Sequence, residues 1–471
     1  MKTKNICISI LCIAVLSACK KDLRESPVSQ HIESASKNGL QSDAELPTYA
    51  ANEILVKFKK NQSEQNKNAA FASVGGTVSK KILTRAMEHF GDNEGFFVIH
   101  TALDVSDAIK KIKTFPTIEY AEPNYIYKHT AVSNDPEYIN GSLWGMYGSQ
   151  SIPANQYGTH ATQAWAAGHV GKGEVYVGVI DEGAEYDHED LVVNLKNPVE
   201  FNGAAGVDDD GNGYIDDTHG WDFYNNDKST YDHATILLPT PHPQDGHGTH
   251  VCGTIGAKGG NAIGVAGVCW NVRMINAKFI GPIGGYTSDA ILAIDYITDL
   301  KTRNGYNIVA TNNSWGGGGF SQLLYDAINR ANAADILFIA AAGNSGTNND
   351  ITPFYPASYD LANIISVAAI DNTGAMAFFS NYGALSVDLA APGVGIKSSY
   401  PTLGAVGSTY ISMDGTSMAA PHVTGAAALY ASTHPGVTAI QIKNQIINQA
   451  RNTPSLAGKV LTAARLDVRN F

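Results

Sequence analysis

The sequence predicts two domains, a small α+β domain followed by a three-layer α/β domain with a mostly parallel, doubly wound sheet. Two observations predict this fold class. From about residue 134 onward, short apolar runs rich in β-branched residues alternate with helical segments, which is typical of parallel strands joined by crossover helices. Before that point, alternating strand patterns surround one helical pattern. Hydrophobic residues make up 44% and charged residues 16% of the chain, a balance that excludes a disordered protein.

The first 52 residues are predicted to be an export signal and a tether. A positively charged start and an apolar run over residues 6–16, too short to span a bilayer, predict a secretory signal over residues 1–18. Leu16-Ser17-Ala18-Cys19 resembles the lipobox of bacterial lipoproteins, which implies an acylated Cys19 and a membrane anchor. An ordinary signal with a chance cysteine is the alternative. Residues 19–52, rich in Ser, Lys, Glu and Gln, are predicted to be a flexible tether.

The small domain is predicted over residues 53–130. Two segments alternate apolar and polar residues, which predicts strands. After the second of them, and before a third strand, apolar residues recur at helical spacing. A proline is expected to break that third strand, because it cannot donate to the ladder. In order, these are strand Ile54–Phe58, strand Gly95–His100, a helix between Asp104 and Phe115, and strand Ile118–Tyr127 with Pro123 inside it.

The large domain is predicted over residues 134–471, with no internal repeat. In sheets of this class the site forms at the carboxyl ends of the strands, so those ends are where functional residues are expected. The predicted strands are Val175–Ile180, Val272–Phe279, Asn307–Thr311, Ile336–Ala340, Ile364–Ala368 and Val387–Leu389.

The net charge limits the binding partners that we expect, and the cysteines bear on whether the protein contains a disulfide. The formal net charge of −12 argues against binding to a phosphate backbone, so nucleic acid is not an expected partner. Of the five cysteines, two fall in the predicted signal and Cys19 in the predicted anchor. That leaves Cys252 and Cys269 in an exported protein, where a disulfide and a pair of buried thiols are both compatible with the sequence.

Polar residues that together suit acyl transfer follow the predicted strands. Asp181 ends the first strand, Asn344 follows the fourth, and Ser417 stands at the mouth of a helix of small residues. A serine needs a base such as His247 to remove its proton, and an ionised aspartate orients that base. The Asn344 side chain and the Ser417 backbone N–H can stabilise an oxyanion. The short spacing of His247 and His250 leaves a metallohydrolase as a rival chemistry.

Two long motifs carry a family resemblance. His247-Gly-Thr-His-Val-Cys-Gly-Thr254 and Gly415-Thr-Ser-Met-Ala-Ala-Pro-His-Val423, following Asp181 in that chain order, resemble the subtilisin-like serine proteases (subtilases). The resemblance implies a serine endopeptidase that acts through an acyl-enzyme, with Asp181, His247 and Ser417 as the triad and Asn344 in the oxyanion hole. It also implies polypeptide substrates and a reaction that requires no cofactor. His250 is then expected to be a packing residue. A catalytically silent pseudoprotease that binds peptides is the alternative.

The same resemblance implies where substrate binds. Two segments are expected to line the cleft and pair their backbones with an extended peptide, and Phe354 occupies a position near the S1 pocket where many relatives have glycine. We therefore expect a shallow pocket that favours a small or medium P1 side chain. The cleft segments are Ser314-Trp315-Gly316 and Ala341-Ala342-Gly343.

The small domain resembles the propeptide of these proteases. This implies that it inhibits the cleft of its own chain and is removed by self-cleavage between about Tyr127 and Ser133. A permanent interaction domain is the competing interpretation. The protein is thus expected to be an exported zymogen, held by lipid at the outer membrane or surface of a bacterial cell.

Two features depart from the family pattern or stand outside it. Glu182 follows Asp181 where the family usually has Ser or Thr, and its charge is predicted to raise the pKa of His247. An acidic loop has the spacing of the front of an EF-hand, so a structural Ca²⁺ is expected there, with a solvated acidic turn as the alternative. The expected ligands are Asp208, Asp210, Asn212, the Tyr214 carbonyl and Asp216, with His219 where an EF-hand has glutamate.

Overall fold

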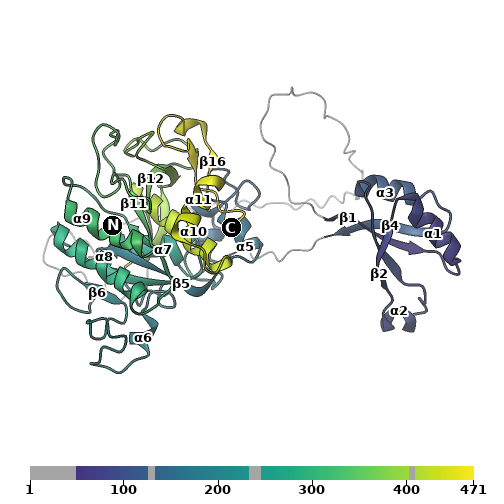
Figure 1. Cartoon of the computed structure of the whole chain (residues 1–471), viewed down its shortest axis with the longest axis horizontal. Coiled ribbons are helices and arrows are strands. Elements are labelled where there is room, and N and C mark those ends of the chain that lie inside the picture. Colours follow the sequence, from purple (N-terminus) through teal and green to yellow (C-terminus); the bar gives the residue numbers. More distant parts are fainter. Residues whose placement is uncertain (1–48, 126–132, 233–244, 402–408) are drawn as a thin grey trace, which may run out of the picture. The chain divides into compact units, whose positions relative to one another are not determined.

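A computed structural model of the chain describes residues 49–125, 133–232, 245–401 and 409–471 (Figure 1). The chain forms two compact units that divide after Tyr127, and each is described by itself. The predicted signal, the lipid site at Cys19, most of the tether and residues 127–132 of the expected processing segment lie outside the described residues. Within the described ranges, no helix is long and apolar enough to cross a membrane.

The first unit is a four-stranded antiparallel sheet in the order β2-β3-β1-β4 with helices packed on it. Its core is centred on three phenylalanines, Phe58, Phe71 and Phe97, which pack edge to face with ring centroids 5.4–5.7 Å apart. The elements are β1 (Tyr49–Phe58), α1 (Glu64–Ser73), β2 (Thr77–Ile82), α2 (Arg85–His89), β3 (Phe96–His100), α3 (Val105–Ile112) and β4 (Ile118–Tyr125).

One expectation for this unit was wrong, and one of its strands was not predicted. Pro123 does not break its strand: it lies inside β4, opposite Ile54 of β1. Because β4 is at the edge of the sheet, a residue without an N–H is tolerated there. Strand β2 was not predicted, since its residues are exposed from Thr77 to Lys81 and show no apolar alternation.

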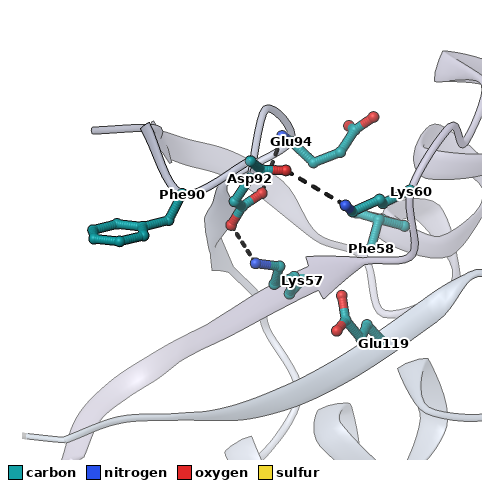
Figure 2. A pocket seen from close by; sticks show the side chains of 8 residues that line it. Lys57, Phe58, Lys60, Phe90, Asp92, Glu94 and Glu119 are labelled. Carbon is teal, nitrogen blue, oxygen red and sulfur yellow. Dashed lines mark hydrogen bonds and ion pairs between the residues drawn. The ribbon is translucent and has the colours of Figure 1, made fainter. Parts of the chain in front are cut away.

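Figure 2 shows a hollow in this unit lined by several charged side chains, of which Lys57 and Asp92 pair with each other. Lys57 forms an ion pair with Asp92, and Lys60 donates to the carbonyl of Gly91 at 3.4 Å. The pairing with Lys57 lowers the pKa of Asp92, so these groups serve the fold of the small unit.

The second unit is built on a nine-stranded sheet in the order β16-β17-β13-β12-β11-β10-β5-β7-β6. Its neighbouring strands pair in parallel, except that β16 and β17 are antiparallel. Five predicted strands are present, as β5 (Gly171–Asp181), β7 (Asn271–Lys278), β10 (Ile308–Asn313), β11 (Leu337–Ala341) and β12 (Ile364–Ile370). The sixth, β13 (Leu389–Pro392), begins at the last residue of its predicted range. The others are β6 (Gly220–Asp222), β16 (Arg451–Asn452), β17 (Ala464–Arg465) and two small hairpins, β8 (Ile280–Gly281) with β9 (Gly284–Gly285) and β14 (Ile396–Tyr400) with β15 (Thr409–Met413).

Helices cover both faces of this sheet and make three layers. Alternate residues of one strand point to opposite faces, so Val179 joins the core beneath α7 and α10, and Ile180 joins the core beneath α8 and α9. Helix α10 is rich in alanine, which lets it lie closely across the central strands. The helices are α4 (Pro136–Ile139), α5 (Ala161–Ala166), α6 (Pro198–Phe201), α7 (Gly246–Gly256), α8 (Thr287–Thr302), α9 (Gln322–Ala333), α10 (Thr416–Thr433) and α11 (Ala439–Gln449), with 3₁₀ turns Trp144–Met146 and Pro454–Leu456.

The two cysteines of this unit form no disulfide. Cys252 and Cys269 are both free and fully buried in the core beneath α7 and α10. The Sγ of Cys252 faces the Asn276 side-chain oxygen at 3.9 Å. Burial raises the pKa of both thiols, to about 12 for Cys269, so each serves as a small apolar packing group.

Candidate active site

Three neighbouring strands place polar side chains at one edge of the sheet. Strands β5, β10 and β11 are adjacent and parallel, so their carboxyl ends coincide. Asp181 is the last residue of β5, Ser314 follows β10 directly, and Asn344 lies three residues beyond β11. The site thus forms at the edge that the strand pattern predicts.

Asp181 and His247 are joined directly across this edge. Asp181 is buried, and its Oδ1 lies 2.8 Å from Nδ1 of His247 at the start of α7. The close approach depends on Gly248, because a Cβ there would come within 1.9 Å of the Gly183 carbonyl oxygen. The glycine of the His-Gly-Thr-His motif therefore lets α7 pack onto the loop that follows Asp181.

Glu182 holds the start of the same helix. Its Oε1 accepts a hydrogen bond of 2.6 Å from the backbone N–H of His247, and its own N–H donates to Asp181 Oδ1 at 2.8 Å. First-turn N–H groups have no acceptor within their helix, so this carboxylate satisfies one of them. Burial and the neighbouring Asp181 raise the pKa of Glu182.

The environment of His247 favours its protonated form. Burial opposes a charge on the ring, but the charge and hydrogen bond of Asp181, and then the charge of Glu182, outweigh it and raise the pKa of His247 to about 9. The ring keeps 27% of its surface exposed, so substrate can reach its free Nε2 edge. The pKa of His247 is thus raised, and the charge of Glu182 contributes to this as the sequence predicted.

Ser417 and Ser314 are joined by two hydrogen bonds. Its hydroxyl donates to the Ser314 carbonyl at 3.0 Å, and in the described residues it makes no bond to His247. In return, the Ser314 hydroxyl donates to the Ser417 carbonyl at 2.8 Å. Pro421, four residues on, lies inside α10 and lacks the N–H that would bind this carbonyl, so Ser314 replaces the missing donor.

Thr416 orients the Asn344 amide. The N–H and hydroxyl of Thr416 both donate to Oδ1 of Asn344 at 2.9 Å. Since a backbone N–H can only donate, the oxygen must face Thr416, which leaves Nδ2 as the outward donor. Sequence reasoning missed this role of Thr416, although a hydroxyl residue beside Ser417 was a signal for it.

The two predicted cleft segments differ in what their backbones can offer. The N–H of Ala342 binds Val367, its carbonyl accepts from Asn349, and the Gly343 N–H binds the Thr416 hydroxyl at 3.2 Å. The N–H groups of Ala342 and Gly343 are therefore already bound within the protein, and substrate binding by this segment stays a prediction. Trp315 and Gly316, in contrast, have no backbone partner among the described residues, and Gly316 is exposed.

Phe354 fills the space between these segments. A Cβ on Gly316 would come within 2.3 Å of its ring, and one on Gly343 within 3.1 Å. The half-buried ring therefore packs against both glycines. The Tyr355–Pro356 peptide bond that follows is cis.

The structure separates His250 from His247. His250 is fully buried, and its Nε2 lies 2.8 Å from the carbonyl oxygen of Ile396. Burial lowers the pKa of His250 to about 3, so it is a neutral packing residue. With one histidine bound to Asp181 and the other to a backbone carbonyl, the pair does not form a metal site.

Comparisons with known proteins agree with this geometry. Residues 172–464 match the model of the subtilase family, and residues 35–124 match the fervidolysin N-terminal prodomain. The chain is 32% identical to a thermophilic serine proteinase of Bacillus sp., over 93% of this chain and 94% of the relative. It is 36% identical to subtilisin DY of Bacillus licheniformis, over 64% and 93%.

Solved structures agree as well. A protease of Pseudoalteromonas arctica superposes with a TM-score of 0.56 at 26% identity, over 71% of this chain and 98% of that one. The family model covers more than half of the chain, and the first of these relatives matches nearly all of it. The chain therefore belongs to the subtilase family of subtilisin-like serine endopeptidases and carries an N-terminal prodomain.

Proposed function

We propose that Asp181, His247 and Ser417 form the catalytic triad, with Asn344 Nδ2 and the Ser417 N–H as the oxyanion hole. The 2.8 Å contact between Asp181 and His247, at the sheet edge that also carries Ser417, supports this assignment most strongly. Asp181 holds the tautomer of His247 that leaves Nε2 free to accept a proton. The alternative metallohydrolase is not supported, since His250 is committed elsewhere.

The reaction begins with a change at Ser417. Its hydroxyl leaves the Ser314 carbonyl and donates to His247 Nε2, as catalytic hydrogen bonds in free enzymes often tighten only with substrate. Oγ attacks the peptide carbonyl carbon, its proton passes to Nε2, and the oxyanion receives hydrogen bonds from Asn344 Nδ2 and the Ser417 N–H. His247 then protonates the leaving amine, and water, deprotonated in turn by His247, hydrolyses the acyl-enzyme.

Substrate is proposed to bind as an extended strand beside Gly316, whose backbone is open, with Gly343 forming part of the S1 wall. The Phe354 ring occupies the space between the two glycines. We therefore propose cleavage after small or medium P1 residues. The Phe354 ring changes the depth of the S1 pocket, so it affects which P1 residues are accepted rather than the chemical step.

The prodomain is proposed to inhibit the cleft until the protease cleaves between about Tyr127 and Ser133. The buried Ser133 and Asp135 support this place, because Asp135 accepts the N–H groups of Gly260, Asn261 and Ala262 at 2.8–3.0 Å. A cut before Ser133 thus leaves an anchored new N-terminus. Sequencing the N-terminus of purified wild type and of Ser417→Ala separates the proposals: a start between residues 128 and 133 in wild type alone supports self-cleavage, and an uncut wild type indicates a permanent domain.

Export and lipid anchoring at Cys19 are proposed from the signal and lipobox-like motif. A match to the extracellular basic protease of Dichelobacter nodosus, 35% identical over 68% of this chain, supports export. In a bacterial host, Cys19→Ala should move the protein from the membrane fraction to the soluble exported fraction. Equal membrane association of both forms would contradict the anchor.

A serine-directed fluorophosphonate probe tests the central assignment. The processed wild type should be labelled at Ser417 and lose activity, and Ser417→Ala should remain unlabelled. Ser314→Ala is the matched control, because it removes a hydroxyl that contacts Ser417 but leaves the proposed nucleophile in place. Absence of labelling in folded, processed wild type would point to a catalytically silent protein.

A further inference from the structure

The acidic loop between β5 and β6 does not use the ligand set that its spacing predicts. Asp216 forms an ion pair of 2.8 Å with Lys228 and accepts the Gly206 N–H. The Asn212 side chain accepts the Tyr214 N–H through its oxygen and donates to Asp217 through its nitrogen. Asp216 is thus directed away, and Asn212 is already bound within the loop.

A different carboxylate completes the cluster. Glu200, in the short helix α6, joins Asp208 and Asp210, and one oxygen from each lies within 4.8 Å of the others. Two oxygens on opposite sides of a Ca²⁺ ion, each at 2.3–2.6 Å, would be separated by about this distance. Figure 1 shows α6 at one end of the catalytic unit, beside this loop.

The Glu200 carboxylate has one oxygen without a partner. The side chain is 4% exposed, and its Oε1 accepts the Asp210 N–H at 2.8 Å. Its Oε2 is buried and has no hydrogen bond within the described residues. A buried carboxylate oxygen without a donor is costly, so a bound cation would resolve it.

The direct hydrogen-bond partners of the cluster are neutral, and Arg303, whose charge acts on Asp208 and Asp210, forms its ion pair with Asp299. The partners of Asp210 are Asn197, the Asn212 N–H and the Tyr306 hydroxyl, all neutral. No lysine or arginine in the described ranges forms an ion pair with the three carboxylates.

We propose that Glu200, Asp208 and Asp210 bind one Ca²⁺ ion, with water in the remaining positions. Oxygen-only ligands suit a hard divalent cation, and the irregular loop suits the flexible coordination of Ca²⁺ better than the strict octahedron of Mg²⁺. The ion joins α6 to the loop. Through Asn197, which binds both Asp210 and Asp217, the loop is in turn connected to Tyr296 of α8. Its role is to stabilise the domain, and it is independent of the proposed triad.

Metal content of the full-length chain carrying Ser417→Ala, which prevents self-digestion, tests the site. After dialysis against calcium buffer, the parent and Asp216→Asn should contain the same number of Ca²⁺ ions per chain. Glu200→Gln and Asp208→Asn should each contain one fewer. Asp216→Asn is the matched control, because it removes a charge from the same loop outside the proposed ligands.

Thermal unfolding gives the second readout. Adding Ca²⁺ to about 100 times the Kd should raise the Tm of the parent and of Asp216→Asn on the order of 5 °C more than that of Glu200→Gln. Equal Ca²⁺ content in parent, Glu200→Gln and Asp208→Asn would overturn the proposal, as would a loss in Asp216→Asn equal to theirs. If Glu200→Gln does not fold, Asp208→Asn decides, since that side chain is half-buried and its amide oxygen can keep a backbone hydrogen bond.

Discussion

Two groups of buried and half-buried carboxylates in the catalytic unit have different surroundings. At the end of β5, Asp181 and Glu182 lie beside His247, and the pKa of that imidazole is raised to about 9. In the loop after α6, Glu200 and Asp210 have only neutral donors. The first group has its cation within the protein, on a side chain that can also release a proton. The second has no cationic side chain among its hydrogen-bond partners, and under the proposal above it takes its cation from solution, where the ion serves stability rather than catalysis.

Removing the charge of Asp181 should cause the largest loss of activity. In Asp181→Asn, the amide favours the wrong tautomer of His247 and no longer stabilises the imidazolium, so kcat should fall about 10⁴-fold. Peptide hydrolysis by the processed enzyme, with Tm as a check on folding, measures this. A loss below tenfold at unchanged Tm would mean that Asp181 is not the partner of the base.

Asn344→Ala tests whether the neighbouring strand end also belongs to the reaction. It removes Nδ2 from the proposed oxyanion hole while the 2.8 Å contact between Asp181 and His247 remains. We expect kcat to fall by about 10²–10³ with little change in KM, since the donor acts on charge that develops in the transition state. An effect confined to KM would assign Asn344 to substrate binding instead.

Phe354→Gly separates pocket shape from charge. Removing the ring that packs against Gly316 and Gly343 should deepen S1. We expect kcat/KM for P1 Phe relative to P1 Ala to rise roughly 10–100-fold, the range that apolar pocket contacts provide. Paired peptides that differ only at P1 measure the ratio. Equal cleavage of both peptides by wild type would refute the shallow pocket.

Glu182→Gln should give the smallest change, visible mainly in the pH profile. Gln keeps an acceptor for the His247 N–H and removes a negative charge that raises the pKa of His247. The base acts when neutral, so activity rises as pH increases through this pKa, near 9. The variant should lower the pKa and move the rise of kcat/KM to lower pH, changing the rate by less than about tenfold. An upward or absent shift would contradict this role of Glu182.

Structural features that appear as a local pattern of residues in the sequence could be predicted. The six long strands are buried apolar runs, and Asp181 and Asn344 follow two of them. Strands of two or three residues, such as β16 and β17, are too short to show a period, so they were missed. The exposed β2 also showed no alternation.

Features that depend on distant contacts were not predictable in this way. Glu200 belongs to another element than the loop it joins, so the loop spacing pointed to Asp216 instead. The disulfide question depended on the positions of Cys252 and Cys269, which spacing does not determine. Thr416 was overlooked because its role depends on where the Asn344 side chain points.

The reciprocal bonds between Ser314 and Ser417 have a mechanical consequence. Each residue donates its hydroxyl to the other's carbonyl, so the start of α10 and the end of β10 are tied at two points. In the proposed mechanism the Ser417 hydroxyl leaves the Ser314 carbonyl for His247, while the bond from the Ser314 hydroxyl still joins the two backbones. The position of the start of α10 relative to the end of β10 is thus fixed by a bond that takes no part in the proposed proton transfer.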